Sequence, residues 1–374
     1  MRRFSAALAA VLLAAASLVA NSQAPASIST VVIATDPDGR PVTDLRADEL
    51  QVFDDGVPQR LSALHVSANG QLRDALTPGA AVGESGRTVV VFIDDMHIRP
   101  ADTPLARQTL RQIRDVVLAP DDLVAVVSTG FSSMEQDLRR DPTRVRFDEL
   151  IQRMTGSADS GGPATTFPAA VVDRFNYHAL VALRTARDVV GRLGGGGPGL
   201  KAVIYVSGGY PVDLEAGDRF ARAQTTYTQP GGLLDPPVNP GRTRTEADVI
   251  AAVAHLTAEA RRANATFYPI DPVGAPRGPD LTLRMSADDW RRSLETQRSA
   301  LRTLSQTTGG ICICGTNDIN PPLRRVASET ANYYLVSFRP DGQNPDRPRH
   351  RVRIATTRSG VILRYAADYF SAPR

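Results

Sequence analysis

The chain has 374 residues, of which 42% are hydrophobic and 22% are charged, and this composition excludes an intrinsically disordered protein. The formal net charge is +3, and Lys201 is the only lysine among the 43 basic residues. Because the arginines are dispersed among acidic residues, as in residues 139–150, and form no basic stripe, we expect no nucleic-acid partner.

Residues 1–24 have the pattern of a cleaved secretory signal peptide. Arg2 and Arg3 precede an apolar run from Ala6 to Ala20, and small polar residues follow. The alternative is a signal anchor that stays in the membrane, although this run is shorter than the ~20 residues of a spanning helix. The signal pattern predicts an exported protein, periplasmic or extracellular. Because no later hydrophobic run approaches the length of a spanning helix, we expect no stable membrane span after cleavage.

Residues 25–70 are predicted to form a small β-module. Within it, residues 51–66 are typical of a β-hairpin with Asp55–Gly56 at its turn. Residues 71–86 are weakly apolar and rich in glycine and other small residues, so we expect a linker there.

Residues 87–340 alternate between predicted strands and predicted helices. The strand runs lack polar alternation, which is typical of strands buried on both faces, and the intervening segments carry apolar residues at helical spacing. Repeated strand–helix–strand units require right-handed crossovers, so we predict a mostly parallel central sheet with helices on both faces. The buried strands are expected at residues 88–94, 123–128, 201–207, 265–271 and 311–315.

The end of the chain returns to β-structure. Residues 333–340 are expected to begin it, and residues 341–374 are expected to form an antiparallel C-terminal β extension. The N-terminal β-module and this extension are each too small to bury much surface alone. We therefore predict that they pack together or against the central domain.

Two adjacent carboxylates, Asp94 and Asp95, end the first buried strand in TVVVFIDDMHIRP, residues 88–100. Such an ending indicates a metal site, an anion-repelling cleft or a helix cap. His97 follows at the carboxyl end of a central strand, where open α/β sheets place their ligands. The other histidines are scattered singly, so we expect ordinary packing or surface roles for them: His65, His178, His255 and His350.

No catalytic motif is found in the sequence. The first βα turn lacks G-x-G-x-x-G, residues 130–134 fail the G-x-S-x-G pattern, and there is no H-E-x-x-H. The alternative function is an exported hydrolase that uses Asp94, Asp95 and His97, because paired carboxylates beside a histidine can do acid/base work. Strand-end carboxylates without a nearby nucleophile are more often structural or ligand-binding, so we expect no enzymatic activity.

Cys312 and Cys314 form a C-x-C pair on a predicted strand, so both side chains should point to the same face. Export favours oxidation, but a bridge across two residues in extended conformation would distort the backbone. The sequence therefore does not decide between a local disulfide and two thiols. Two thiolates alone would make a poor metal site.

Four runs of the chain together resemble the exported bacterial von Willebrand factor A (VWFA)-related domain proteins of the acidobacterial type. The resemblance covers nearly the whole mature chain, and the last run is the most specific. The runs are PDGRPVTDLRADELQVFDDGVPQ (37–59), VVVFIDDMH (89–97), VIYVSGGYP (203–211) and LRTLSQTTGGICICGTNDINPPLRRVASETANYYLVSFRP (301–340).

The resemblance implies a Rossmann-like von Willebrand A domain that binds an unknown protein partner, in an adhesion-type role, instead of catalysing a reaction. In such domains a divalent cation occupies a metal-ion-dependent adhesion site, or MIDAS. Its ligands come from a D-x-S-x-S motif, a later threonine and the aspartate of an S/T-D-G turn, and these hard oxygen ligands suit Mg²⁺ or Ca²⁺.

Compared with that motif, this site is expected to be degenerate. Asp94 matches the first aspartate, but Met96 and Ile98 stand in place of the two serines, and Asp95 matches no ligand position. Gly208 stands in place of the aspartate of the S/T-D-G turn. The flanking matches and the loop that could supply the threonine are Ser207, Gly209, Thr165 and Thr166.

We therefore expect that no cofactor is required, with residual Mg²⁺ or Ca²⁺ binding by Asp94 and Asp95 as the alternative. Without a cation the two like charges repel each other, so we expect helix amides beyond Thr103 or arginine side chains to neutralise them. The partner-binding face is predicted to include Asp94, Asp95, His97 and Ser207.

Overall fold

The computed structural model describes most of the chain. The described residues are 27–77, 87–129, 139–140, 143–158, 169–194, 197, 199–210, 212–214, 219–227, 243–275, 286–341 and 349–370. The expected signal peptide, residues 130–134 and the candidate ligands Thr165 and Thr166 lie outside the described residues.

A parallel sheet forms the centre of the molecule, as the sequence predicts. In the described part of the chain its strand order is β10–β9–β6–β7, all parallel, with β8 antiparallel at the β7 edge. β9 and β10 are buried along their whole length, which explains why their sequences show no polar alternation. The strands are β6 (Thr88–Ile93), β7 (Leu123–Ser128), β8 (Arg139–Arg140), β9 (Lys201–Val206) and β10 (Ala265–Ile270).

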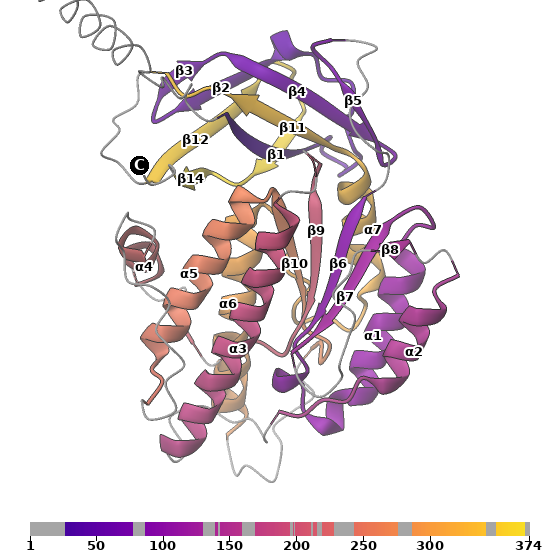
Figure 1. Ribbon diagram of the computed structural model, residues 1–374, viewed down its shortest axis with the longest axis vertical. Helices are drawn as coiled ribbons and strands as arrows, with labels where there is room; N and C mark the ends of the chain where they lie inside the picture. Colours follow the sequence, from indigo (N-terminus) through magenta and orange to yellow (C-terminus); the bar gives the residue numbers. More distant parts are fainter. Residues whose placement is uncertain are drawn as a thin grey trace, which may run out of the picture.

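Helices cover both faces of this sheet (Figure 1). Apolar side chains of α3, α4, α5 and α6 form one core layer against the sheet, and those of α1, α2 and α7 form the other. The helices are α1 (Thr103–Val116), α2 (Val145–Arg153), α3 (Ala169–Leu193), α4 (Arg219–Tyr227), α5 (Glu246–Arg262), α6 (Ala287–Thr308) and α7 (Asn320–Ala331), with short 3-10 helices η1 (Ala47–Glu49), η2 (Asp95–His97) and η3 (Pro100–Asp102).

The remaining described strands form an antiparallel β unit. One sheet has the order β13–β1–β11–β4–β5 and the other β14–β12–β2–β3, and their inner faces share one apolar cluster. The strands are β1 (Ile28–Thr35), β2 (Leu50–Asp54), β3 (Val57–Gln59), β4 (Leu61–Ala68), β5 (Gln71–Asp74), β11 (Tyr333–Phe338), β12 (Arg349–Thr356), β13 (Ile362–Tyr365) and β14 (Asp368–Phe370).

The first described strands and the last ones therefore meet in common sheets. β1 lies between β11 and β13, and β2 pairs with β12, which confirms the predicted packing of the N-terminal and C-terminal strands. The predicted hairpin forms in part: β2 and β3 are joined at Asp55–Gly56, but residues 61–66 belong to β4 in the other sheet. Two details differ from the expected organisation: β5 lies inside the expected linker, and β11, expected in the central domain, belongs to the β unit.

The β unit lies at the end of the parallel sheet where the strands begin (Figure 1). The backbone N–H of Leu200, just before β9, donates to the hydroxyl of Tyr333 in β11 at 3.1 Å. The carboxyl ends of the parallel strands consequently point away from the β unit, toward the opposite end of the molecule.

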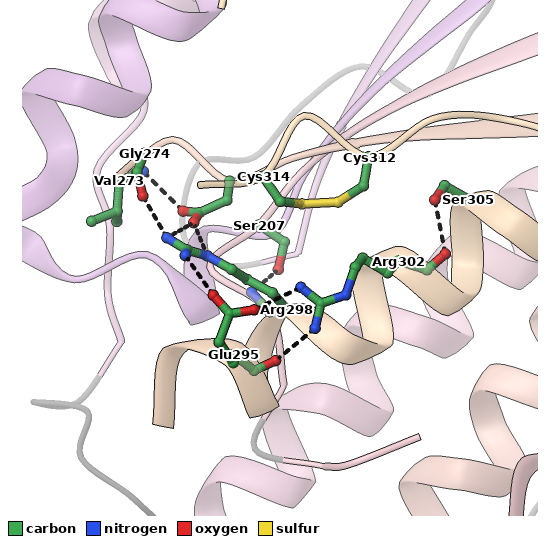
Figure 2. Close-up of a disulfide and its surroundings, with 11 residues drawn as sticks. Ser207, Val273, Gly274, Glu295, Arg298, Arg302, Ser305, Cys312 and Cys314 are labelled. Carbon is green, nitrogen blue, oxygen red and sulfur yellow. Dashed lines mark hydrogen bonds and ion pairs between the residues drawn. A yellow bond between two sulfur atoms is a disulfide. The ribbon is translucent and has the colours of Figure 1, made fainter. Parts of the chain in front are cut away.

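The expected fifth strand at residues 311–315 does not form. Only Ile313 makes an isolated parallel bridge, to Ile270 of β10. Glycines flank this segment, and a Cβ on Gly310 would lie 1.9 Å from the carbonyl oxygen of Phe267, so the chain there passes directly against β10. A disulfide joins Cys312 to Cys314, whose Cα atoms are 5.5 Å apart, and this answers the question that the sequence leaves open (Figure 2).

We predict that a chain beginning at Gly86 is less soluble and less stable than the full mature chain. Such a chain lacks β1 and β4, so β11 loses both of its neighbours and a buried apolar face becomes exposed. Solubility and thermal denaturation of the two proteins measure the effect. Equal values would show that the β unit does not depend on its N-terminal strands.

Candidate functional site

Polar residues gather where the parallel strands end. Asp94 follows β6, Thr129 follows β7, Ser207 follows β9 and Asp271 follows β10. Each apolar run ends on a polar residue, and parallel pairing brings these ends to one edge of the sheet. The structure thereby assembles a buried polar cluster at the edge that open α/β sheets use for ligands.

Asp94 is the centre of this cluster. Its carboxylate is completely buried. Oδ1 accepts hydrogen bonds from His97 Nδ1 at 2.8 Å and from the Thr129 hydroxyl at 3.3 Å. Oδ2 accepts from the hydroxyls of Ser207 at 2.8 Å and Tyr210 at 3.1 Å. These four described donors meet the acceptor capacity of one ionised carboxylate, with the single hydroxyl proton of Thr129 shared between Asp94 and Asp95.

Tyr210 stays a donor under all ordinary conditions. Burial raises the pKa of its phenol well above the usual value, and the negative charge of Asp94 raises the pKa further. The phenol is therefore neutral and keeps its proton for the hydrogen bond to Asp94.

Asp95 is also completely buried, and its carboxylate lies at the end of β7. Its carboxylate accepts from the hydroxyls of Ser128 at 2.9 Å and Thr129 at 3.2 Å. Its backbone carbonyl accepts from the N–H of Ser157 at 2.8 Å. Thr129 thus contacts both carboxylates and lies between the two like charges.

The expected neutralisation of the carboxylates is wrong for Asp94. Its described partners are hydroxyls and the imidazole of His97, with neither an arginine nor a helix amide among them. The first turn of α1 makes other contacts instead: the hydroxyl of Thr103 accepts from the N–H of Gly156 at 3.0 Å. Hydroxyls at neighbouring strand ends lie closer to Asp94 than the helix start does, because parallel pairing holds the strand ends together.

The residues present do not fit a MIDAS cation. Ile98 is buried in the apolar core, and Met96 offers a thioether. A Cβ on Gly208 would lie 2.2 Å from the carbonyl oxygen of His97, so an aspartate cannot stand there unless the backbone moves. Both oxygens of Asp94 already accept two hydrogen bonds each, which a cation would have to displace.

The four residues predicted to form the partner-binding face are together but are not on the surface. Asp94, Asp95 and Ser207 are 0% exposed and His97 is 7% exposed. These side chains are therefore not available for direct contact with a partner. The sequence places these side chains at a strand end, but it does not show that hydroxyl donors enclose them.

His97 keeps one nitrogen without a hydrogen bond. Its Nδ1 is bound to Asp94, whereas Nε2 is buried and has no hydrogen-bond partner among the described residues. The imidazole lies edge-on to the Tyr210 ring, with 4.8 Å between the centroids. It also lines a cavity of about 50 Å³, whose other walls include Phe175, Gly208, Asp271, Trp290 and Gln297. A cavity of this size accommodates water molecules.

Asp271, which lines this cavity, belongs to a buried ion pair. Arg298 of α6 donates from Nε to Asp271 Oδ2 at 2.7 Å, and its Nη2 donates to the carbonyl of Gly274. Burial raises the pKa of Asp271, and the guanidinium of Arg298 opposes that rise. Figure 2 shows Arg298 reaching from α6 to the loop after β10, beside the disulfide. The pair ties α6 to the sheet edge.

Sequence reasoning missed several members of the site. Ser128 ends the second buried strand and Thr129 follows it, and their position at the same edge as Asp94 was the available signal. Tyr210 lies in the turn after Ser207 and carried no signal of its own. The pairing of Asp271 with Arg298 joins residues 27 positions apart and has no local pattern.

No protein-family model matches the chain, and a search of curated proteins finds no match either. Among the residues that the structure describes, no helix is long and apolar enough to cross a membrane.

We predict that Gly208→Ala lowers the free energy of unfolding by about 1–3 kcal/mol, because the new methyl group overlaps the carbonyl oxygen of His97. Gly191→Ala is the matched control. Gly191 lies near the end of α3, where an added Cβ makes only an ordinary contact, 3.6 Å from Glu259. That change should stabilise the protein by about 0.5–1 kcal/mol. Urea denaturation measures both, and equal stability of the two variants would contradict the close approach.

Proposed function

We propose that the chain is an exported von Willebrand A-type protein that binds a protein partner at the carboxyl-end face of its parallel sheet. It does so without catalysis and without a divalent cation. The observation that carries the proposal is the closed state of Asp94, whose two oxygens are filled by hydroxyl and imidazole donors. A carboxylate held in this way can order the strand ends, but it has no free oxygen for a cation.

The binding role is supported by the position of the cluster and by the family resemblance. Ligands of open α/β sheets bind outside the carboxyl ends of the strands, and this edge faces away from the β unit. The resemblance to von Willebrand A-related proteins implies partner binding at the same edge.

Export is supported by two features. The first 24 residues have the pattern of a secretory signal. The disulfide between Cys312 and Cys314 suits an oxidising compartment, because such bonds are rare in the cytosol. We accordingly propose a periplasmic or extracellular location.

Exposed residues around the cluster are the surface that a partner would touch. Ala101 in η3 and Asn317 after the disulfide are exposed near the carboxyl ends of β6 and β10. Ala101→Arg adds a long charged side chain there, and the methyl group that it replaces makes no hydrogen bonds. Ser359→Arg makes the same addition at an exposed turn of the β unit and serves as the matched control.

We predict that crosslinking from the native exported fraction captures one protein with the wild-type chain and with Ser359→Arg, in the presence of EDTA as well as Mg²⁺. Ala101→Arg should reduce the capture at least tenfold, because a charge in the centre of an interface is costly to bury. Mass spectrometry of the crosslinked product identifies the partner. Equal capture by both variants would place the interface elsewhere, and loss of capture in EDTA would contradict metal independence.

A hydrolase is the second candidate, and one observation favours it. Asp94 orients the imidazole of His97 through Nδ1, and His97 lines a cavity that accommodates water. An oriented imidazole next to a water molecule is one arrangement of a general base. Turnover of ester, phosphate or glycoside substrates that disappears in His97→Gln, while the fold is retained, would favour this candidate over binding. We expect no such turnover.

A further inference from the structure

A second polar cluster lies in the β unit, outside the parallel-sheet site. It consists of Asp54, Asp55 and His350, and one potential ligand atom from each side chain lies within 4.8 Å of the others. Asp54 ends β2, Asp55 begins the turn of the β2–β3 hairpin, and His350 is in β12, which pairs with β2.

The register explains why these groups meet inside the protein. Val352 of β12 lies opposite Asp54 of β2, so His350 is two residues nearer the hairpin turn on the same face. The side chains preceding them on this inner face are apolar. The inner face is formed by Leu50, Val52 and Asp54 from one strand and by His350, Val352 and Ile354 from the other.

A carboxylate and an imidazole at the end of an apolar stripe require partners, because burial of polar groups without them is costly. His350 is 1% exposed, and its Nε2 has no hydrogen-bond partner among the described residues. Its Nδ1 lies 3.0 Å from Asp55 Oδ2. The imidazole is therefore held at Nδ1 by the carboxylate of Asp55, whereas Nε2 has no hydrogen bond to any described protein atom.

Other groups hold the two carboxylates in position. The hydroxyl of Tyr369 donates to Asp54 Oδ2 at 2.9 Å, and the Tyr369 ring stacks on the His350 imidazole with 5.0 Å between centroids. The backbone N–H of Arg351 donates to Asp55 Oδ1 at 2.9 Å. Ligands of protein metal sites are oriented by outer hydrogen bonds of this kind.

We propose that Asp54, Asp55 and His350 bind one divalent transition-metal ion, of which Zn²⁺ fits best. One imidazole nitrogen and carboxylate oxygens form a donor set that suits Zn²⁺ and is poor for Ca²⁺ or Mg²⁺, which prefer oxygen alone. Asp55 is exposed, so the ion can enter from solvent, and on binding it displaces the hydrogen bond between Asp55 Oδ2 and His350 Nδ1. The bound ion joins the β2–β3 hairpin to β12 and so crosslinks the N-terminal and C-terminal strands.

The test uses the untagged protein, stripped with a chelator and then dialysed against Zn²⁺. We expect one Zn²⁺ per chain and a higher melting temperature on binding, because the ion binds only the folded arrangement. His350→Ala and Asp54→Asn should each weaken binding at least tenfold. His65→Ala, which removes a histidine of the same β unit outside the cluster, should bind as the wild type does.

Cobalt provides an independent readout, because Co²⁺ in a site of low coordination number absorbs visible light. That absorption should appear with the wild type and with His65→Ala, and should be absent from His350→Ala. If His350→Ala does not fold, Asp55→Asn, at an exposed position, makes the same comparison. The proposal is overturned if the wild type binds no Zn²⁺ at micromolar concentrations, or if binding is the same in the cluster variants and in His65→Ala.

Discussion

The buried carboxylate of Asp94 is the group on which the arrangement of the sheet edge depends. A carboxylate removed from water loses several kcal/mol of solvation unless hydrogen bonds replace it. Here the replacement comes from three places: His97 from the turn after β6, Thr129 from the end of β7, and Ser207 with Tyr210 from the segment after β9. The charge therefore holds three strand ends in one geometry, and loss of any donor would leave it under-satisfied.

The same constraint separates this site from a cation site. The carboxylate oxygens that would bind a cation in a MIDAS are occupied here by hydroxyl and imidazole donors. Gly208 lies so close to the backbone of His97 that no side chain fits there, and Gly209 has a φ of +86° and approaches the carbonyl of Gln297 equally closely. Without side chains at Gly208 and Gly209, the turn after β9 can pack closely against the backbones of His97 and Gln297. This packing places Ser207 and Tyr210 next to Asp94.

Local pattern was enough to predict the parallel strands, the helices other than α4 and the turn at Asp55–Gly56, because burial on both faces and turn residues produce recognisable sequence patterns. The helix α4 was missed because it lies in a stretch rich in proline and glycine. Local pattern also failed for residues 311–315, where an apolar run resembles a strand but carries a disulfide between its two cysteines and is flanked by glycines. The sequence predicts that the N-terminal and C-terminal β segments pack together, but not that their strands pair in common sheets. The pairing of β1 with β11 joins residues about 300 positions apart, and no local signal specifies such a register.

For the site, the sequence identified the acidic centre and His97 but not the groups that enclose them. Hydroxyl donors such as Thr129 are common residues, and only the parallel register shows that they converge on Asp94. Burial was also not predictable, because a strand end can be open or covered. This is why a face expected to contact a partner directly proved to be an interior cluster.

Calorimetric titration with Mg²⁺, Ca²⁺ and Mn²⁺ tests the central claim most directly, with the wild type compared with Asp94→Asn, which keeps the shape of the side chain and removes its charge. The account predicts that the two proteins give the same heats, since the oxygens of Asp94 are already occupied by protein donors. A one-to-one site at physiological concentrations that is present in the wild type and absent from Asp94→Asn would contradict it.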